Sequence, residues 1–179
     1  PTGIQQTIRG NFQVWSYRQT DVSLSGLDMD TQYAFTNKFG FQQQFSLVKG
    51  YELETKTPLI NMPGVNMINA LNYTYKQIEM RIESDYTWRQ NEFPDTNFEA
   101  FIPETQTIEL IDVSTPPEAY HLMNLTFGGP LNFSEKFNFS WTLDIQNVFN
   151  TAYRNYLNGM RFYADELGRN VLISLTSTF

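Results

Sequence analysis

Apolar and polar residues alternate with a period of two along most of this chain, which is the pattern of β-strands that present two different faces. In residues 137–145 every second side chain is Phe, Trp, Leu or Ile, and the others are Asn, Ser, Thr and Asp. Residues 78–88 alternate in the same way, apart from Ser84, a single small polar residue in the apolar row. The alternation predicts about eight strands, near 8–17, 22–35, 39–50, 65–75, 78–90, 120–131, 136–147 and 169–179.

The connections between these strands alternate in length. In an up-and-down arrangement all short turns then lie at one edge of the sheet and all long loops at the other, which is the asymmetry of outer-membrane barrels. The connection near 18–21 is an exception, because it is short where a long one is expected. The short turns are 36–38, 76–77 and 132–135, and the long loops are 51–64, 91–119 and 148–168.

A soluble antiparallel sandwich would show the same alternation, so the length and chemistry of the runs matter. The apolar rows continue for about 9–11 residues, the length that a tilted strand needs to cross a bilayer. Aromatic residues make up 16% of the chain, and membrane–water interfaces are rich in them. A mean hydropathy of −0.40 is compatible with a barrel that has a wet lumen and long loops. The pattern favours an all-β, transmembrane antiparallel barrel.

The run 22–35 changes phase. Leu27, Met29, Tyr33 and Phe35 share one face, whereas Val22 and Leu24 lie on the opposite face. Gly26 marks a bulge that corrects the phase, or Val22 and Leu24 lie above the membrane, where the alternation is relaxed. Both explanations remain open.

Residue types that carry catalytic or metal chemistry are sparse. The chain has no cysteine and one histidine, His121, so neither a thiolate metal site nor a Ser/His/Asp set is expected. The net charge of −7 argues against a nucleic-acid partner, because phosphate binding needs Lys and Arg. Glu83 and Asp85 lie about 7 Å apart on one strand face, but Arg81 and Arg89 share that row. A salt-bridge network is therefore a better interpretation than catalysis, and we expect no enzyme activity, metal or cofactor.

Four segments resemble the TonB-dependent receptors of the outer membrane, most closely those of the Bacteroidetes type. The family's penultimate strand is similar to DIQNVFNTAYRNYLN at 144–158, and its closing strand resembles RFYADELGRNVLISLTSTF at 161–179. An upstream strand and an external loop of the family resemble SLSGLDMDTQYAF at 23–35 and TPLINMPG at 57–64. The four segments occur in the family's order, so the resemblance covers nearly the whole chain.

Several residues of these segments suit their places. Asn147 and Asn150 lie where a strand gives way to a loop, and Asn tolerates the left-handed conformations needed there. Gly168 offers the same freedom before the last strand begins. Two positions depart from the family pattern: Asp28 stands where Glu is usual, and Leu167 stands where Pro often precedes Gly-Arg-Asn.

The family fold is a 22-stranded barrel with an N-terminal plug inside it. The resemblance implies that residues 1–179 are the C-terminal part of such a barrel, about its last eight strands, with the plug and earlier strands absent from this chain. Unpaired strand edges are not tolerated in lipid. The ends of the segment are therefore expected to pair with other strands of the same barrel, and the chain, which opens at Pro1 without a Met, is expected to be a fragment.

The resemblance also implies a function, the energy-coupled import of a scarce nutrient such as an iron–siderophore, a vitamin or a glycan across the outer membrane of a Gram-negative bacterium. The expected partners are outer-membrane lipid, the rest of the barrel and its plug, TonB acting through the absent N-terminal region, the barrel-assembly machinery and the transported small molecule. The C-terminus would lie on the periplasmic side, with Phe179 as the assembly signal. The ligand-binding residues are not assigned. A lumen-facing network would consist of Asp28, Glu79, Arg81, Glu83, Asp85 and Asp144.

Two other architectures remain open. One is a complete small structural barrel that closes strand 8–17 on strand 169–179. Its narrow interior would have to be filled by side chains, whereas the inward rows here hold many Ser, Thr, Asn, Gln and Gly residues. The other is a soluble carbohydrate-binding sandwich. An intact mass near the 20.9 kDa of this chain would favour the small barrel, and solubility without detergent would favour the sandwich.

Overall fold

The computed structural model describes residues 3–7, 10–14, 19–94, 97–102, 105–112, 115–134 and 137–178. The chain divides into two compact units, which are described separately. The first comprises Pro1–Ser25, Lys49–Met62 and Asn91–Pro116, and the second comprises Gly26–Val48, Pro63–Gln90 and Pro117–Phe179. Within the described ranges, no helix has both the length and the apolar character that a membrane-spanning helix requires.

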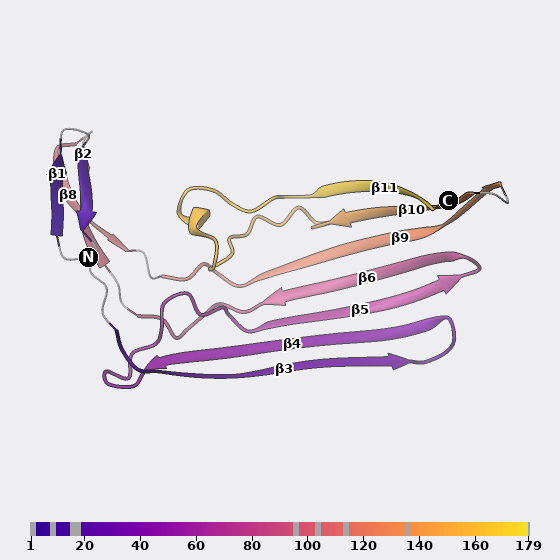
Figure 1. The fold of residues 1–179 in the computed structure, drawn as a ribbon, viewed down its shortest axis with the longest axis horizontal. Coiled ribbons are helices and arrows are strands. Elements are labelled where there is room, and N and C mark those ends of the chain that lie inside the picture. Colours follow the sequence, from indigo (N-terminus) through magenta and orange to yellow (C-terminus); the bar gives the residue numbers. More distant parts are fainter. Residues whose placement is uncertain are drawn as a thin grey trace. The chain divides into compact units, whose positions relative to one another are not determined.

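Seven strands form one antiparallel sheet (Figure 1). In sheet order they are β11 (Asn170–Thr178), β10 (Phe137–Gln146), β9 (Tyr120–Ser134), β6 (Ile78–Thr87), β5 (Asn66–Tyr75), β4 (Phe39–Glu52) and β3 (Val22–Ala34). Strands that follow one another in the sequence are neighbours, except that β6 pairs with β9 across the long intervening segment. This is the up-and-down order that the alternating connection lengths predict.

Two further strand pairs form separate two-stranded sheets in the first unit. β1 (Gly3–Thr7) pairs with β2 (Gly10–Val14), and β7 (Asn97–Ile102) pairs with β8 (Thr107–Asp112). The prediction that 8–17 is a strand of the main sheet is therefore wrong. Its central residues pair with the strand just before them, and such local pairing needs little loop-closure entropy. The main sheet has seven strands rather than eight, and the segment predicted as a loop at 91–119 contains a hairpin.

The two edges of the main sheet are β3 and β11, which do not pair with each other in the described part of the chain. A complete small barrel would require residues 8–17 to pair with 169–179. The structure instead pairs β2 with β1 and β11 with β10. The alternative of a closed eight-stranded barrel is thus not the arrangement found.

Two of the predicted tight turns have clear local causes. At 36–38 the Thr36 hydroxyl oxygen accepts hydrogen bonds from the backbone N–H of Lys38 at 3.1 Å and of Phe39 at 3.0 Å. At 76–77 Lys76 has a φ of 55°, as two-residue hairpin turns require. Most of the third predicted turn, 132–135, belongs instead to β9, which continues to Ser134.

Of the three residues predicted to provide conformational freedom around the loop after β10, the structure confirms the two asparagines. Asn147 and Asn150 have φ values of 49° and 55°, which confirms their left-handed conformations. Gly168 serves another purpose than the predicted conformational freedom. A Cβ atom at this position would lie 2.5 Å from Asn150 Oδ1, so a larger residue here would force that side chain to move.

An apolar cluster in the first unit bears on the phase change near Gly26. A Cβ atom at Gly50 would lie 2.8 Å from Leu24 Cδ2, 2.8 Å from Leu59 Cδ1 and 3.0 Å from Met62 Sδ. Leu24 therefore packs with residues of the 51–64 segment over Gly50. Leu24 remains 63% exposed despite this contact. The contact with the 51–64 segment favours the explanation in which the alternation is relaxed at this end of the strand.

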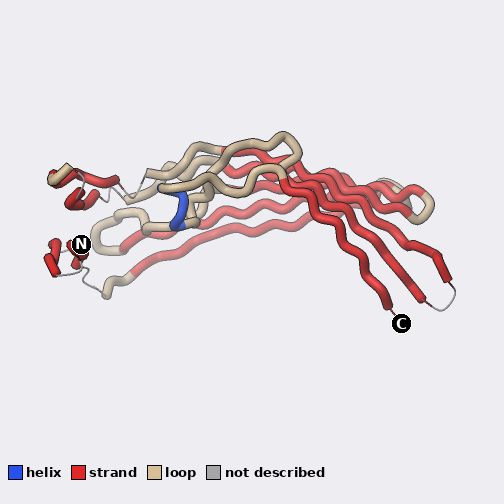
Figure 2. The backbone as a smooth tube through the Cα atoms, turned by 90° about the horizontal axis from the view of Figure 1, so that it is seen from above, coloured by secondary structure: helices blue, strands red, loops and turns tan. Residues whose placement is uncertain are grey.

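The two faces of the sheet in the second unit differ in exposure. On the apolar face the exposed fractions are 47% for Ile82 and 54% for Val171, whereas on the polar face Ala70 and Leu122 are only 1% and 9% exposed. Figure 2 shows the strands of this sheet as a single curved layer. The register places one apolar residue from each of six adjacent strands in a continuous row: Phe41, Leu71, Ile82, Leu125, Ile145 and Val171.

Candidate functional site

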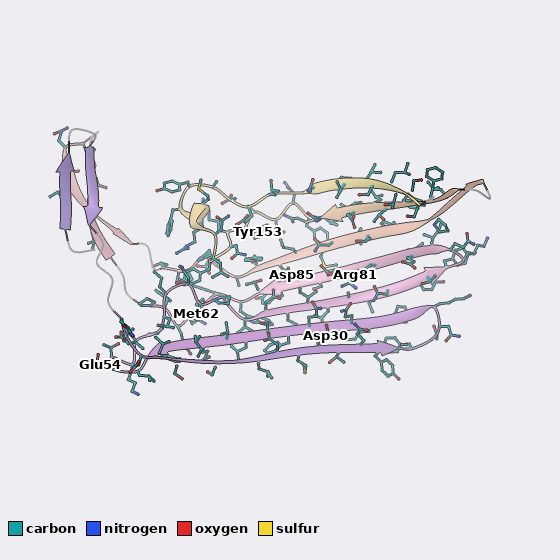
Figure 3. All side chains as sticks on the ribbon, viewed as in Figure 1. Asp30, Glu54, Met62, Arg81, Asp85 and Tyr153 are labelled. Atoms are coloured by element: carbon teal, nitrogen blue, oxygen red, sulfur yellow. The ribbon has the colours of Figure 1, made fainter. Side chains whose placement is uncertain are left out.

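The polar face of the sheet is centred on Arg81 of β6 (Figure 3). Its Nε and Nη2 donate to Glu83 Oε2 at 3.1 and 2.8 Å. Its Nη1 donates to Gln42 Oε1 at 3.0 Å and to Asn72 Oδ1 at 3.2 Å. Ala70 lies opposite Glu83 and has only a methyl side chain, which leaves space for the longer polar groups around it. Arg81 thus joins three neighbouring strands, β4, β5 and β6.

The same network continues across β9 to the end of β10. Asn124 Nδ2 donates to Glu83 Oε1 at 3.1 Å, and the Asn124 side-chain oxygen accepts from the backbone N–H of Asn147 at 2.9 Å. Beside this pair, Thr126 Oγ1 donates to Asp144 Oδ1 at 2.7 Å. The polar groups of β9 therefore connect the Arg81 ion pair to the point where β10 gives way to the 148–168 loop.

On the other side of Arg81, the carboxylates of β3 bond to β4. Ser46 Oγ donates to Asp28 Oδ1 at 2.6 Å, and Gln44 Nε2 donates to Asp30 Oδ2 at 3.0 Å. These two bonds hold the β3 acids on the face that Gln42 shares with Arg81. Asp28 and Asp30 also line a hollow of about 400 Å³ on this face.

Asp85 occupies the end of β6 nearest the long loops (Figure 3). Asn66 Nδ2 donates to Asp85 Oδ1 at 2.7 Å and to Thr87 Oγ1 at 2.9 Å. A cavity of about 230 Å³ opens here between the strand ends and the 148–168 loop, with Glu118 and Asn155 in its wall. The carboxylates, amides and hydroxyls around it can form several hydrogen bonds to a polar ligand.

The 148–168 loop is held in place by its own polar contacts. Asn147 Nδ2 donates to the Thr151 carbonyl oxygen at 2.8 Å, and the Thr151 N–H donates back to Asn147 Oδ1 at 2.8 Å. Arg154 bonds to Asp165 at 2.6 Å. Burial raises the pKa of Tyr153, whose ring lies 4.6 Å from that of Tyr120 in the cavity wall.

A short 3₁₀ helix, η1 (Gly159–Phe162), contains the one arginine of the loop that is almost fully buried. Arg161 Nη1 donates to the Tyr156 carbonyl oxygen at 2.6 Å. Its guanidinium carbon also lies 4.6 and 4.3 Å from the ring centres of Tyr156 and Phe162. Burial lowers the pKa of Arg161. These contacts give the loop a small aromatic core.

A second polar cluster belongs to the first unit. Glu92 accepts hydrogen bonds from the Lys49 ammonium and the Tyr51 hydroxyl. The bond from Lys49, followed by that from Tyr51, lowers the pKa of Glu92. Nearby in the sequence, the buried Glu52 accepts from Thr20 Oγ1 at 2.7 Å and from Thr55 Oγ1 at 2.8 Å. The carboxylates of Glu92 and Glu52 thus connect the end of β4 by hydrogen bonds to Thr20, which precedes β3, and to the segment that begins at Asn91.

The six acids and bases predicted as one network lie on one face of the sheet, though the bonds among them differ from the prediction. In that row Arg81 and Glu83 form an ion pair, whereas Asp85 bonds to Asn66 and Arg89 pairs with Glu118 at 2.7 Å. Glu79 lies on the same face, opposite Thr74 and Gly128 near the 76–77 turn. Phe179, predicted as the assembly signal, lies outside the described residues.

The sequence argument missed the uncharged members of the network. The sequence predicts that the charged side chains bond to one another. In the structure many of their hydrogen bonds go instead to the side-chain amides of Gln42, Asn66, Asn72 and Asn124. Each occupies a polar position of an alternating run, so the period of two already placed it on this face. Within the described residues, no cluster of three or more His, Asp or Glu side chains could hold a metal ion.

An open antiparallel sheet with an exposed apolar face and a hydrogen-bonded polar face is the arrangement of a β-barrel wall in the outer membrane. The copper transporter OprC, an outer-membrane barrel, has a similar structure, with a TM-score of 0.73 at 12% sequence identity. The match covers 97% of this chain and 25% of OprC, so the chain spans about a quarter of that protein's length. No family model matches the sequence, and no curated protein does. The likeness shows the fold alone.

Proposed function

We propose that this chain forms part of the wall of an outer-membrane transport barrel, with its polar face toward a water-filled lumen and its apolar face toward lipid. The observation that carries the proposal is the contrast in exposure between adjacent side chains of β6. Large apolar side chains such as Ile82 are exposed, while the charged side chains of Arg81 and Glu83 are 30% and 24% exposed and bonded to each other. An extended apolar face is unstable in water and stable against hydrocarbon.

The transport is the energy-coupled import of a scarce nutrient. The segments 144–158 and 161–179, which resemble TonB-dependent receptors, support this proposal. The plug, the remaining strands and the site of TonB action would belong to other parts of the barrel. The cargo would be an iron–siderophore, a vitamin or a glycan, and the name of OprC adds copper ions as a candidate.

The long connections 51–64, 91–119 and 148–168 would lie outside the cell and capture the ligand, with the C-terminus and Phe179 on the periplasmic side. The cavity beside Asp85 and Asn155 supports ligand capture at this end, because it lies where the polar face meets the long loops. Its hydrogen-bonding groups would be the first part of the wall that an entering polar ligand meets.

Uptake measurements test this function. Cells with and without the gene receive, separately, a labelled ferric siderophore, cyanocobalamin, an oligosaccharide or copper ions. We expect one of these compounds to accumulate only in cells that have both the gene and an active TonB system. If none accumulates, or if accumulation persists without TonB, the proposed function is contradicted. A deletion strain that carries the Asp85→Ala protein should retain the barrel and take up the cargo more slowly.

A further inference from the structure

The apolar face contains one polar row that the transport proposal does not use. The register places Gln43 of β4 opposite Asn69 of β5, and Asn69 opposite Ser84 of β6. Ser84 Oγ and His121 Nε2 of β9 lie 2.7 Å apart. On the other side, the bonds from Ser46 to Asp28 and from Gln44 to Asp30 fit an antiparallel alignment in which Thr31 of β3 lies beside Gln43. The outer polar row therefore consists of four residues from adjacent strands, Thr31, Gln43, Asn69 and Ser84. On β9 the register places Met123 opposite Ser84, and His121 lies one position nearer the long loops, opposite Tyr86.

The outer polar row lies within the apolar band rather than at its border. Successive side chains on one face of a strand are about 7 Å apart, and apolar residues occupy the neighbouring positions on both sides of Asn69. Toward the short turns these positions hold Phe41, Leu71 and Ile82, and toward the long loops they hold Phe45, Met67 and Tyr86. If this face meets lipid, the row lies in hydrocarbon.

The bonds within the row leave hydrogen-bonding groups available at its centre. Gln43 Nε2 donates to Asn69 Oδ1 at 2.9 Å, which occupies one lone pair of that oxygen. Asn69 Nδ2 has no acceptor within the described part of the chain. Hydrocarbon offers neither donors nor acceptors. The side-chain amide of Asn69 can therefore form two further hydrogen bonds, one as donor and one as acceptor. Only a partner with polar groups at the same depth in the membrane can form them.

We propose that the outer polar row is the surface through which two copies of this barrel associate within the membrane. A two-fold axis along the membrane normal keeps every residue at its own depth, so an axis that passes beside Asn69 brings the Asn69 side chains of the two copies together. Each carboxamide then donates from Nδ2 and accepts at the free lone pair of Oδ1, which forms a reciprocal pair. The row contains no Asp, Glu, Lys or Arg, so like charges do not oppose the approach.

This inference rests on the proposed orientation of the apolar face toward lipid, but it goes beyond the import of a cargo and can fail while import stands. The outer polar row lies on the opposite face of the sheet from Arg81 and Asp85. Substitutions in the row leave the polar face unchanged. A monomeric barrel could still import its cargo, and a dimer could form in a barrel that imports nothing.

Cross-linking of the full-length protein in its own outer membrane tests the proposal. The reporter is Leu71→Cys, which lies beside Asn69 on the apolar face and leaves the amide intact; this chain has no native cysteine. A short membrane-permeant bis-maleimide should give a product of twice the monomer mass. The control is Ile173→Cys on β11, which is 74% exposed on the same face and away from the row, and it should remain monomeric.

Substitutions at Asn69 complete the test. In the Leu71→Cys protein, Asn69→Leu should reduce the dimer yield at least five-fold, whereas Asn69→Gln, which keeps a carboxamide, should retain most of it. Heat-modifiable migration on gels verifies that each variant is folded. The proposal is overturned if the reporter gives no dimer, if the Ile173→Cys control cross-links equally, if Asn69→Leu has no effect, or if the product has the mass of a different partner.

Discussion

At the scale of single residues, Arg81 shows how a charge is accommodated on the polar face. A charged group that is partly removed from water is costly unless all its hydrogen bonds are made. The guanidinium of Arg81 donates to one carboxylate, Glu83, and to two amide oxygens, those of Gln42 and Asn72. Neighbouring positions on the same strand, such as Ile82, carry no polar group and face the other way.

The two faces predict opposite responses to substitution at adjacent positions. Ile82→Arg places a charge on the apolar face, which costs about 2–4 kcal/mol at the middle of a bilayer, so assembly should be impaired. Arg81→Ile should be milder, because Glu83 keeps the hydrogen bond from Asn124 and remains in a polar environment. The measurement is heat-modifiable migration of each variant in detergent gels. Equal loss in both variants, or greater loss in Arg81→Ile, would contradict the assignment of the faces.

The charged members of the polar network could be predicted from the sequence, whereas their uncharged partners could not. Asp28, Arg81, Glu83, Asp85 and Asp144 are conspicuous because charges alternate with apolar residues. Their partners are mostly amides on strands that are distant in sequence, and a bond such as Asn66 to Asp85 depends on the register between β5 and β6. Periodicity fixes which face a residue takes, whereas the register also depends on turn geometry.

At the scale of elements, the strands were predictable because their signal is local. Each of these runs alternates with a period of two, and this alternation predicts the bounds of β4, β5, β6 and β10 to within a few residues. The hairpin of β1 and β2 was missed because pairing with a preceding short strand leaves no mark on periodicity. The same holds for β7 and β8, whose six-residue strands are too short to stand out within the 91–119 segment.

The start of β11 depends on a close approach of the Asn150 side chain to Gly168. Asn150 Oδ1 accepts from the backbone N–H of Arg169 at 2.8 Å, and Gly168 leaves room for it. Gly168→Ala should displace this side chain and destabilise the protein by about 1 kcal/mol, the order of one hydrogen bond. Gly159→Ala is the matched control, since a Cβ there meets nothing within 4 Å. Protease cleavage within 148–168 should accelerate for the first variant only; equal rates for both would sink this explanation.

The attachment of Glu92 to the end of β4 should depend on pH. The ordinary pKa of a glutamate is 4.5 here, and the bond from Lys49 lowers the value in the folded protein. A depressed carboxylate pKa stabilises the fold above the ordinary value, and this stabilisation is lost as the pH falls through the lowered value. Amide hydrogen exchange at 91–94, corrected for its intrinsic pH dependence, should therefore accelerate on acidification below pH 4.5. The Glu92→Gln protein should lack this response, and an identical response would refute the explanation.

At the scale of the whole molecule, the account depends on which solvent each face of the sheet meets. The fold is shared with an outer-membrane barrel. Ile82 and Val171 on the apolar face are exposed, whereas Ala70 and Leu122 on the polar face are buried. A soluble sandwich would need a second layer to cover Ile82 and Val171. A barrel wall needs only lipid there and water on the side of Arg81.

Thiol labelling at two adjacent positions tests this claim most directly. Ile82→Cys and Arg81→Cys are introduced separately into the folded barrel in membranes, in a chain that has no cysteine of its own. A membrane-impermeant maleimide should react readily with the protein substituted at position 81, where water fills the lumen. It should react with the protein substituted at position 82 only after unfolding. Ready labelling at position 82 together with protection at position 81 would contradict the barrel-wall assignment of this sheet.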